Sequence, residues 1–263
     1  AMQGLQSSGL YAAQLTEGAL GALAQSSHND KREELNETMR TEGDSALSSL
    51  TMEFAQVNLK SFEVTPEELS NTDKALTKTA QNAIVAAAKN IERFHREQIP
   101  KPILINTVPG VRCELAIRPI QSIGLYVPGG GNPLVSTALM LAIPAALAEC
   151  PTVVLCSPPS KNGKIDAGVL FVAKEYGIRK IFKLGGAQAI AAMAYGTQTV
   201  SKVNKIFGPG NKWVAAAKAH VSRDPSGAAQ DLPAGPSELM VIADGKANPA
   251  FVAADLLSQA EHD

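Results

Sequence analysis

A chain of 263 residues with 45% hydrophobic side chains can bury a substantial core, which excludes a wholly disordered protein. Its 24 basic and 25 acidic residues are mixed along the chain and give a net charge of −1, so no basic surface is expected for nucleic acid or an anionic membrane. Three cysteines, an odd number without C-x-x-C spacing, argue against a disulfide framework and a zinc ribbon and fit reduced thiols.

The apolar runs and the start of the sequence give no sign of a membrane span or an export signal. The longest apolar run, about residues 139–147, is too short to cross a bilayer and contains Pro144. The Gln- and Ser-rich start has neither a basic region nor an apolar signal stretch. We expect a cytoplasmic protein that binds small molecules, without a nucleic-acid or membrane partner.

The first hundred residues are predicted to be mainly helical. Residues 1–30 carry a weak helical pattern, and two short helices follow on either side of Gly43. Residues 65–68 (TPEE) combine a Thr cap, a first-turn Pro and a third-position Glu, which together form a capping box and begin a helix. An apolar stripe predicts a further helix from about residue 73 to 98.

Strands dominate the prediction after Pro102. Two short β-rich pieces, 103–105 and 115–117, flank the turn at Pro109-Gly110 and predict a hairpin or a pair of edge strands. Strands and helices then alternate. The strands are expected at about 123–127, 152–156, 180–184 and 203–207, and the helices at about 134–148, 166–176, 187–195 and 212–221. Four successive βα units predict an α/β fold whose parallel sheet is covered on both faces.

A rigid segment at 231–236 is suited to a hinge between two domains. We predict a helical region with strands at 1–125, a sheet domain at 126–235, and the start of a second α/β domain at 236–263 that packs with the first region. That last part is expected to hold a strand at 239–243 and a terminal helix.

Glycine-rich turns follow three of the predicted strands, at 126–131, 185–188 and 208–211. Ligands of open α/β sheets bind at this edge, where backbone groups and helix N-termini can hold an anion such as a pyrophosphate. One such turn is more often a tight connection than a binding site, but three on one edge favour a site. The sequence contains neither G-x-G-x-x-G with its downstream acidic residue nor the P-loop Lys-Ser/Thr.

Several polar residues near these turns are site candidates with simpler alternative roles. Gln188 and Asn211 each begin a helix, where a lone residue is more often a cap. Tyr126 alone would be a packed aromatic, and Ser237 has no evident base that would make it a nucleophile.

The terminal helix pattern places two metal-ligand candidates on one face. Gln259 and His262 share this face with Asp255, while Leu256 and Leu257 should turn inward. Two ligands do not complete a zinc site, and a single His on a helix is usually solvated or capping.

Taken together, the motifs resemble the histidinol dehydrogenase family over about residues 40–263. The segments that carry the resemblance are 126–130 (YVPGG), 136–140 (STALM), 185–191 (GGAQAIA), 195–197 (YGT), 208–211 (GPGN), 233–238 (PAGPSE) and 255–262 (DLLSQAEH). The resemblance implies NAD-dependent oxidation of L-histidinol to L-histidine through the aldehyde, in histidine biosynthesis. It also implies two incomplete Rossmann-like domains in an intertwined homodimer.

The resemblance also implies roles for individual residues. Tyr126, Gln188 and Asn211 would contact NAD⁺, and Ser237 would hold the substrate. The 259–262 pair, Gln259 and His262, would bind both the substrate and one zinc ion per site, which would anchor the imidazole and amine of histidinol.

The family pattern extends past the 259–262 motif, where it supplies a Glu-His acid–base pair and two further zinc ligands. We therefore expect a truncated chain without catalytic residues of its own, unable to turn over histidinol alone. Two rival interpretations are a transferase or phosphate-binding enzyme on the same sheet, and a non-catalytic binding or assembly module. Fold alone does not separate these possibilities.

Overall fold

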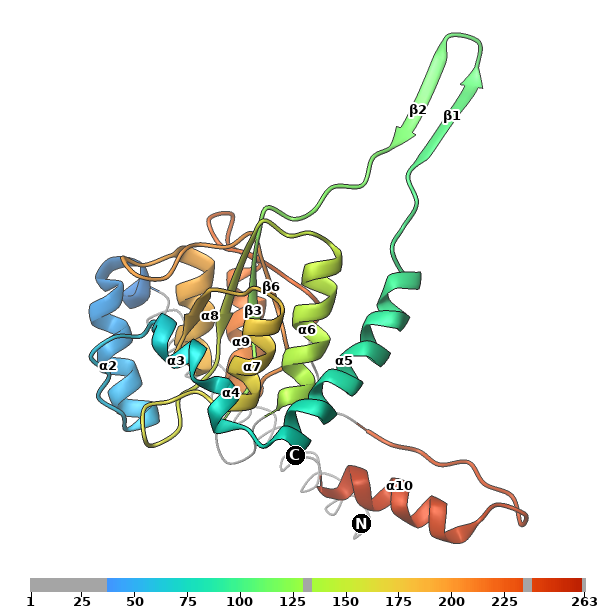
Figure 1. Cartoon of the computed structure of the whole chain (residues 1–263). Coiled ribbons are helices and arrows are strands. Elements are labelled where there is room, and N and C mark those ends of the chain that lie inside the picture. Colours follow the sequence, from blue (N-terminus) through green and yellow to red (C-terminus); the bar gives the residue numbers. More distant parts are fainter. Residues whose placement is uncertain (1–36, 130–133, 234–237, 262–263) are drawn as a thin grey trace, which may run out of the picture. The chain divides into compact units, whose positions relative to one another are not determined.

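The computed structural model describes residues 37–129, 134–233 and 238–261. The chain forms two compact units, Ala1–Asp231 and Leu232–Asp263. The first unit contains a five-stranded sheet, of which β3 and β6 are labelled in Figure 1 together with the surrounding helices. Its strands, in spatial order, are β5 (Lys180–Phe182), β4 (Thr152–Cys156), β3 (Ser122–Tyr126), β6 (Lys205–Phe207) and β7 (Ala229–Gln230).

Every strand pair in this sheet is parallel, which confirms the predicted α/β class. Helices follow the strands, and the observed bounds lie within a few residues of the predicted ones. They are α6 (Val135–Leu147), α7 (Ala167–Glu175), α8 (Gly186–Tyr195) and α9 (Lys212–Val221). Strand β7 was not predicted, because two residues are too short to produce an alternating pattern.

Two separate apolar cores show that both faces of the sheet are covered. Along β3, Ile123 and Leu125 join the core with α6 and α7, while Tyr126 joins the core with α8 and α9. Gly124 lies beneath α8, since a Cβ added to it would be 2.6 Å from Sδ of Met193. Each of these four helices follows a strand, so the helix N-termini lie at the carboxyl edge of the sheet.

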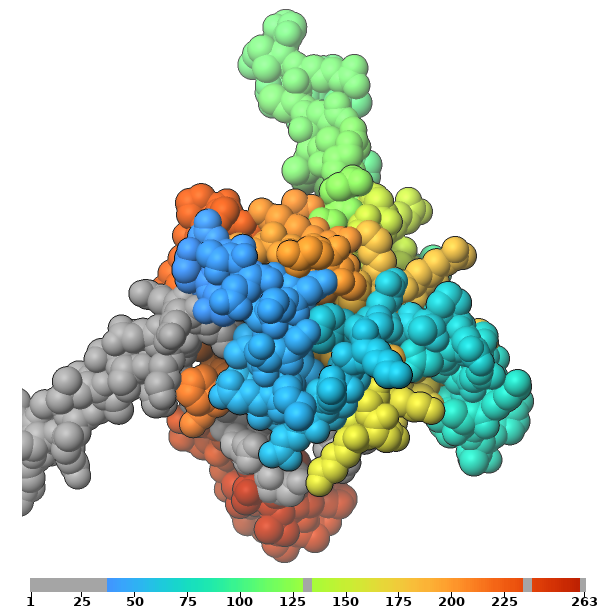
Figure 2. All heavy atoms as spheres, turned by 90° about the vertical axis from the view of Figure 1, so that its left-hand side faces the viewer, coloured from blue at the N-terminus to red at the C-terminus, as the bar shows by residue number. Residues whose placement is uncertain are grey.

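Among the described residues, the helical part before the sheet comprises a helical segment at 37–42 and four labelled helices, α2 (Asp44–Ala55), α3 (Pro66–Ser70), α4 (Thr72–Ala75) and α5 (Lys78–Glu97). Helix α2, blue in Figure 2, is tied to the loop after α8: the Asp44 N–H donates to Oε1 of Gln198 at 2.8 Å, and the Thr199 hydroxyl donates to the Asp44 carboxylate. The capping box at Thr65 and Glu68 is confirmed.

The predicted helix over 73–98 is wrong as a single element, because the chain is extended at Leu76 and Thr77 begins α5 by accepting a hydrogen bond from the Ala80 N–H. Thr is a strong helix cap, so this break had a local signal. The predicted helix within residues 1–30 lies outside the described residues.

The predicted hairpin is confirmed as β1 (Ile103–Val108) paired antiparallel with β2 (Val111–Leu115). The second strand was predicted at 115–117 and is displaced, since β2 begins directly after the turn and ends at Leu115. All eleven strand residues of this hairpin are exposed.

In the second unit, helix α10 (Pro249–Glu261) is present but the predicted strand at 239–243 is wrong. No segment in the described ranges pairs with residues 239–243, and Met240 and Ile242 are 84% and 92% exposed. A strand without a partner leaves its backbone groups to water. The expectation that Leu256 and Leu257 turn inward also fails, since they are 47% and 68% exposed.

Candidate functional site

The carboxyl edge of the parallel sheet brings together the loops after β3, β4, β5 and β6. Strand register places Tyr126 beside Cys156, and Cys156 beside Phe182, so the loops that follow these residues begin at one level. The loop after β3 reaches Gly129 before the described residues break off. The glycine-rich turns singled out in the sequence therefore share one sheet edge.

Tyr126 joins the first of these loops to the third. Its side chain is 4% exposed, and its hydroxyl accepts a hydrogen bond from the Gly186 N–H at 3.0 Å. Burial raises the pKa of Tyr126, and the hydrogen bond from Gly186 opposes that rise only in part. The hydroxyl thus keeps its proton at neutral pH and can donate it to an acceptor.

The third loop enters helix α8 with a backbone that only glycine adopts readily. Gly186 has φ +69°, and a Cβ there would lie 2.6 Å from Oε1 of Gln188. Gln188 is 4% exposed in the first turn of α8, and the cap position is Gly185, so Gln188 is not a helix cap. Since Gly185 has no side chain to cap the helix, the start of α8 can accept an anion.

Asn211 does act as a cap, in agreement with the simpler of its two predicted roles. Its Oδ1 accepts hydrogen bonds from the N–H groups of Trp213 and Val214, both at 3.1 Å. The residue is exposed, and the cap uses only the carbonyl end of its amide. The NH₂ end can therefore serve as a hydrogen-bond donor to a ligand.

Close backbone packing fits these loops against one another. Gly208 has φ +122°, and a Cβ there would lie 2.1 Å from the Tyr126 carbonyl oxygen. Pro158, after β4, fills the space between Gly129 and Gly185, where added Cβ atoms would approach it to 3.0 and 2.5 Å. The glycines are thus required by contacts between loops, beyond the turns that they make.

Hollows of different sizes lie in the described part of the first unit, and two of them are relevant to the predicted site. A small cavity of about 70 Å³ adjoins Gly129, Pro158 and Asp166 at the carboxyl edge, which is enough for a few water molecules. A larger one of about 530 Å³ lies between residues 56–65 and 161–163. It contains none of the predicted site residues.

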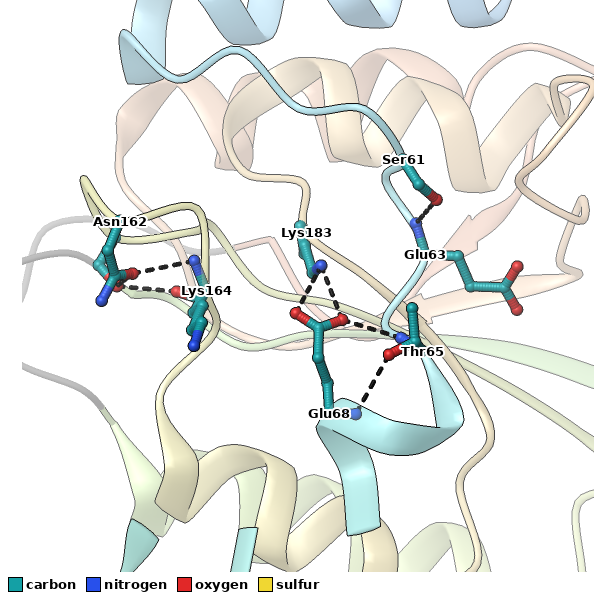
Figure 3. A network of polar contacts seen from close by, with 8 residues as sticks. Ser61, Glu63, Thr65, Glu68, Asn162, Lys164 and Lys183 are labelled. Atoms are coloured by element: carbon teal, nitrogen blue, oxygen red, sulfur yellow. Dashed lines mark hydrogen bonds and ion pairs between the residues drawn. The ribbon is translucent and has the colours of Figure 1, made fainter. Parts of the chain in front are cut away.

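The larger hollow borders the ion pair of Lys183 and Glu68, drawn in Figure 3. Lys183 follows β5 and is 8% exposed, and its Nζ lies 2.8 Å from both carboxylate oxygens of Glu68 in α3. The Lys183 N–H donates to the Phe62 carbonyl at 2.7 Å, and Val64 donates to Ile181 at 2.8 Å. These bonds close the β5 edge of the sheet, which gives this cluster a structural role.

The comparisons with known proteins agree with this fold. The family model described as histidinol dehydrogenase matches residues 21–263. The chain is 54% identical over 224 residues to histidinol dehydrogenase of Vibrio parahaemolyticus, covering 85% of this chain and 51% of that protein. It is 53% identical over 228 residues to that of Xylella fastidiosa, covering 87% and 53% respectively. This chain belongs to the histidinol dehydrogenase family.

A solved structure of the family leads to the same conclusion. The crystal structure of histidinol dehydrogenase from Elizabethkingia anophelis superposes with a TM-score of 0.84 at 46% identity, covering 89% of this chain and 54% of that one. The family resemblance inferred from the motifs is therefore confirmed. The chain spans about half the length of the relatives that it matches.

The other site residues predicted for this chain lie in its second unit or outside the described residues. Gln259 lies in α10 of the second unit, whereas Ser237 and His262 lie outside the described ranges. Within those ranges, no group of three or more His, Cys, Asp or Glu side chains could hold a metal ion. Of the two predicted zinc ligands, the structure describes only Gln259. In that same part, no helix is both long and apolar enough to cross a membrane.

Sequence reasoning missed two charged residues at the fourth loop. Lys218 in α9 is 4% exposed, and its Nζ donates to the Gly208 carbonyl at 2.8 Å and to the carboxylate of Asp231. A signal for Lys218 was present, because it shares the buried stripe of α9 with Val214, Ala217 and Val221. A lysine on such a stripe needs a partner inside the protein.

Proposed function

We propose that the carboxyl edge of the sheet binds NAD⁺, and that the protein oxidises L-histidinol to L-histidine through the aldehyde in histidine biosynthesis. The observation that carries the proposal is the packing of three glycine-rich loops at one edge, where Gly186 has a φ of +69° that side chains rarely adopt and Gly208 leaves no room for a side chain. A dinucleotide requires such close backbone approach to its phosphates. The name of the relatives, histidinol dehydrogenase, supports the substrate and the class of reaction, whereas NAD⁺, the aldehyde and the product come from the family resemblance.

Each candidate residue at this edge would make a different contact with the cofactor. The uncapped start of α8 would hold the pyrophosphate with its N–H groups, and Gln188 would lie beside it. Asn211 would donate from its amide NH₂, and Tyr126 from its hydroxyl. When bound, NAD⁺ accepts the hydride that leaves the alcohol carbon of the substrate. The task of the chain would be to hold the cofactor against that carbon.

The remaining parts of the proposal come from the family resemblance. Gln259 and His262 would bind zinc together with the substrate, and Ser237 would contact the substrate. Residues 126–235 would form the cofactor domain, in a cytoplasmic homodimer. Zinc content measured on Gln259→Ala protein, beside a sedimentation measurement of mass, tests the metal ligand and the dimer.

Calorimetric titration with NAD⁺ tests the cofactor site. We expect saturable binding by the wild-type chain, and weaker binding after Gln188→Ala or Asn211→Ala. Absence of NAD⁺ binding, together with stabilisation by sugar or acyl phosphates, would instead support a transferase or phosphate-binding enzyme. Formation of NADH on addition of L-histidinol and zinc tests the substrate in a separate measurement, made on protein that spans the full length of the relatives.

A further inference from the structure

A buried ion pair lies directly behind the glycine-rich loop 208–211, which follows β6. Lys218 extends from α9 and Asp231 follows β7, and their side chains are 5% and 19% exposed. Both side chains also bind the backbone of one residue, Gly208. The Lys218 Nζ donates to the Gly208 carbonyl at 2.8 Å, and the Gly208 N–H donates to Oδ2 of Asp231 at 2.9 Å.

The sheet determines where Asp231 lies. Strand β7 pairs in parallel with β6, with Ile206 beside Gln230, and the Asp231 N–H donates to the Ile206 carbonyl at 3.1 Å. This register carries the carboxylate to the end of β6, where the loop begins. The two-residue strand β7 thus places Asp231 next to the end of β6.

The backbone conformation of Gly208 is one that the hydrogen bonds to Lys218 and Asp231 can stabilise. A glycine has more accessible backbone conformations than any other residue, and this one has φ +122° with the Tyr126 carbonyl beside it. The two hydrogen bonds hold both polar groups of Gly208. They therefore fix the direction in which the loop leaves the sheet, toward Asn211 and the start of α9.

Stability alone gives little reason for this pair to exist. Burying two charges costs desolvation energy that their attraction often fails to recover, and apolar residues of similar size are frequently as stabilising. Lys218 lies on the buried stripe of α9, whose other members, Val214, Ala217 and Val221, are apolar. The distinctive contribution of the pair is the orientation of Gly208.

We propose that Lys218 and Asp231 are positioning residues, which hold loop 208–211 in the geometry that binds the cofactor. This inference rests on the proposed NAD⁺ site. The pair touches the loop backbone and acts on the cofactor through it. Preorganising a binding loop increases affinity by reducing the entropy lost on binding.

The test compares Lys218→Met with a matched control, Lys183→Met. Both lysines are buried and both pair with one carboxylate, but Lys183 binds Glu68 of α3 (Figure 3). The first measurement is hydrogen exchange at the Gly208 amide without cofactor. We expect faster exchange in Lys218→Met, wild-type exchange in Lys183→Met, and partial recovery in Lys218→Arg.

The second measurement is the dissociation constant for NAD⁺. We expect it to rise about tenfold in Lys218→Met, equivalent to about 1.4 kcal/mol, and to remain unchanged in Lys183→Met. Asp231→Asn should give a smaller rise, because an amide oxygen can still accept from Gly208. This variant also serves if Lys218→Met fails to fold.

The outcomes separate this inference from the function on which it rests. Unchanged exchange at Gly208 in Lys218→Met overturns the positioning role, whether or not NAD⁺ binds. Faster exchange without weaker binding also overturns it, as does an equal loss of affinity in Lys183→Met. If the wild-type chain does not bind NAD⁺, the cofactor site itself is wrong, while the exchange data still decide whether the pair orders the loop.

Discussion

The contact between Gly208 and the Tyr126 carbonyl gives the sharpest test of how the loops are packed. In Gly208→Ala the new Cβ would lie 2.1 Å from that oxygen and 3.2 Å from Cδ1 of Leu141. Both the Cβ and the oxygen are fixed to backbone, so relief requires β3 and β6 to separate. We expect about 1–3 kcal/mol from this overpacking. Positive φ adds about 1–2 kcal/mol for a residue with a Cβ.

The control is Gly177→Ala, which measures the free-energy cost of a positive φ without a steric clash. Gly177 has φ +68°, and a Cβ there meets no atom within 4 Å. We expect this variant to lose about 1–2 kcal/mol of unfolding free energy, and Gly208→Ala to lose about 2–5 kcal/mol in total. Urea unfolding followed by circular dichroism measures both. If Gly208→Ala costs no more than Gly177→Ala, the close approach of the two loops is refuted.

Three further predictions concern the helices and thiols around the sheet. Burial acts to raise the pKa of the Glu68 carboxyl, but the hydrogen bonds from Lys183 and Thr65 together lower it by more. The net pKa therefore lies below the ordinary 4.5. Glu68→Gln should therefore destabilise by about 1–2 kcal/mol at neutral pH, and the loss should vanish as pH falls through that lowered value, as urea titrations would show. In native protein, N-ethylmaleimide should label exposed Cys113 and spare Cys156, whose pKa is raised by burial; mass spectrometry that finds both labelled equally would contradict this burial. Asp166→Ala should cost about 1 kcal/mol in thermal or urea unfolding, because Asp166 accepts from the N–H groups at the start of α7 at 2.8 and 3.3 Å.

The sheet and its order of elements were predictable because each βα unit carries a local pattern. Residues 152–156 form an apolar run between prolines, as a strand buried on both faces requires, and they form β4. The capping box at 65–68 is also a local signal, and the structure contains it. By contrast, the apolar stretch at 239–243 resembles a strand but has no partner among the described residues. Pairing depends on the neighbouring chain, which a local pattern does not report.

The same difference holds in the candidate site, where some residues can be recognised from a short sequence motif and others only from the folded sheet. Gln188 and Asn211 lie in glycine-rich turns that are visible as short motifs, so the sequence alone is enough to nominate them. Lys218 and Asp231 lie thirteen positions apart, and only the pairing of β7 with β6 brings them to Gly208. A motif identifies the residues that face a ligand, because their chemistry requires particular side chains at short spacing. The residues that hold the motif in place are selected by topology, so their roles follow only from the assembled sheet.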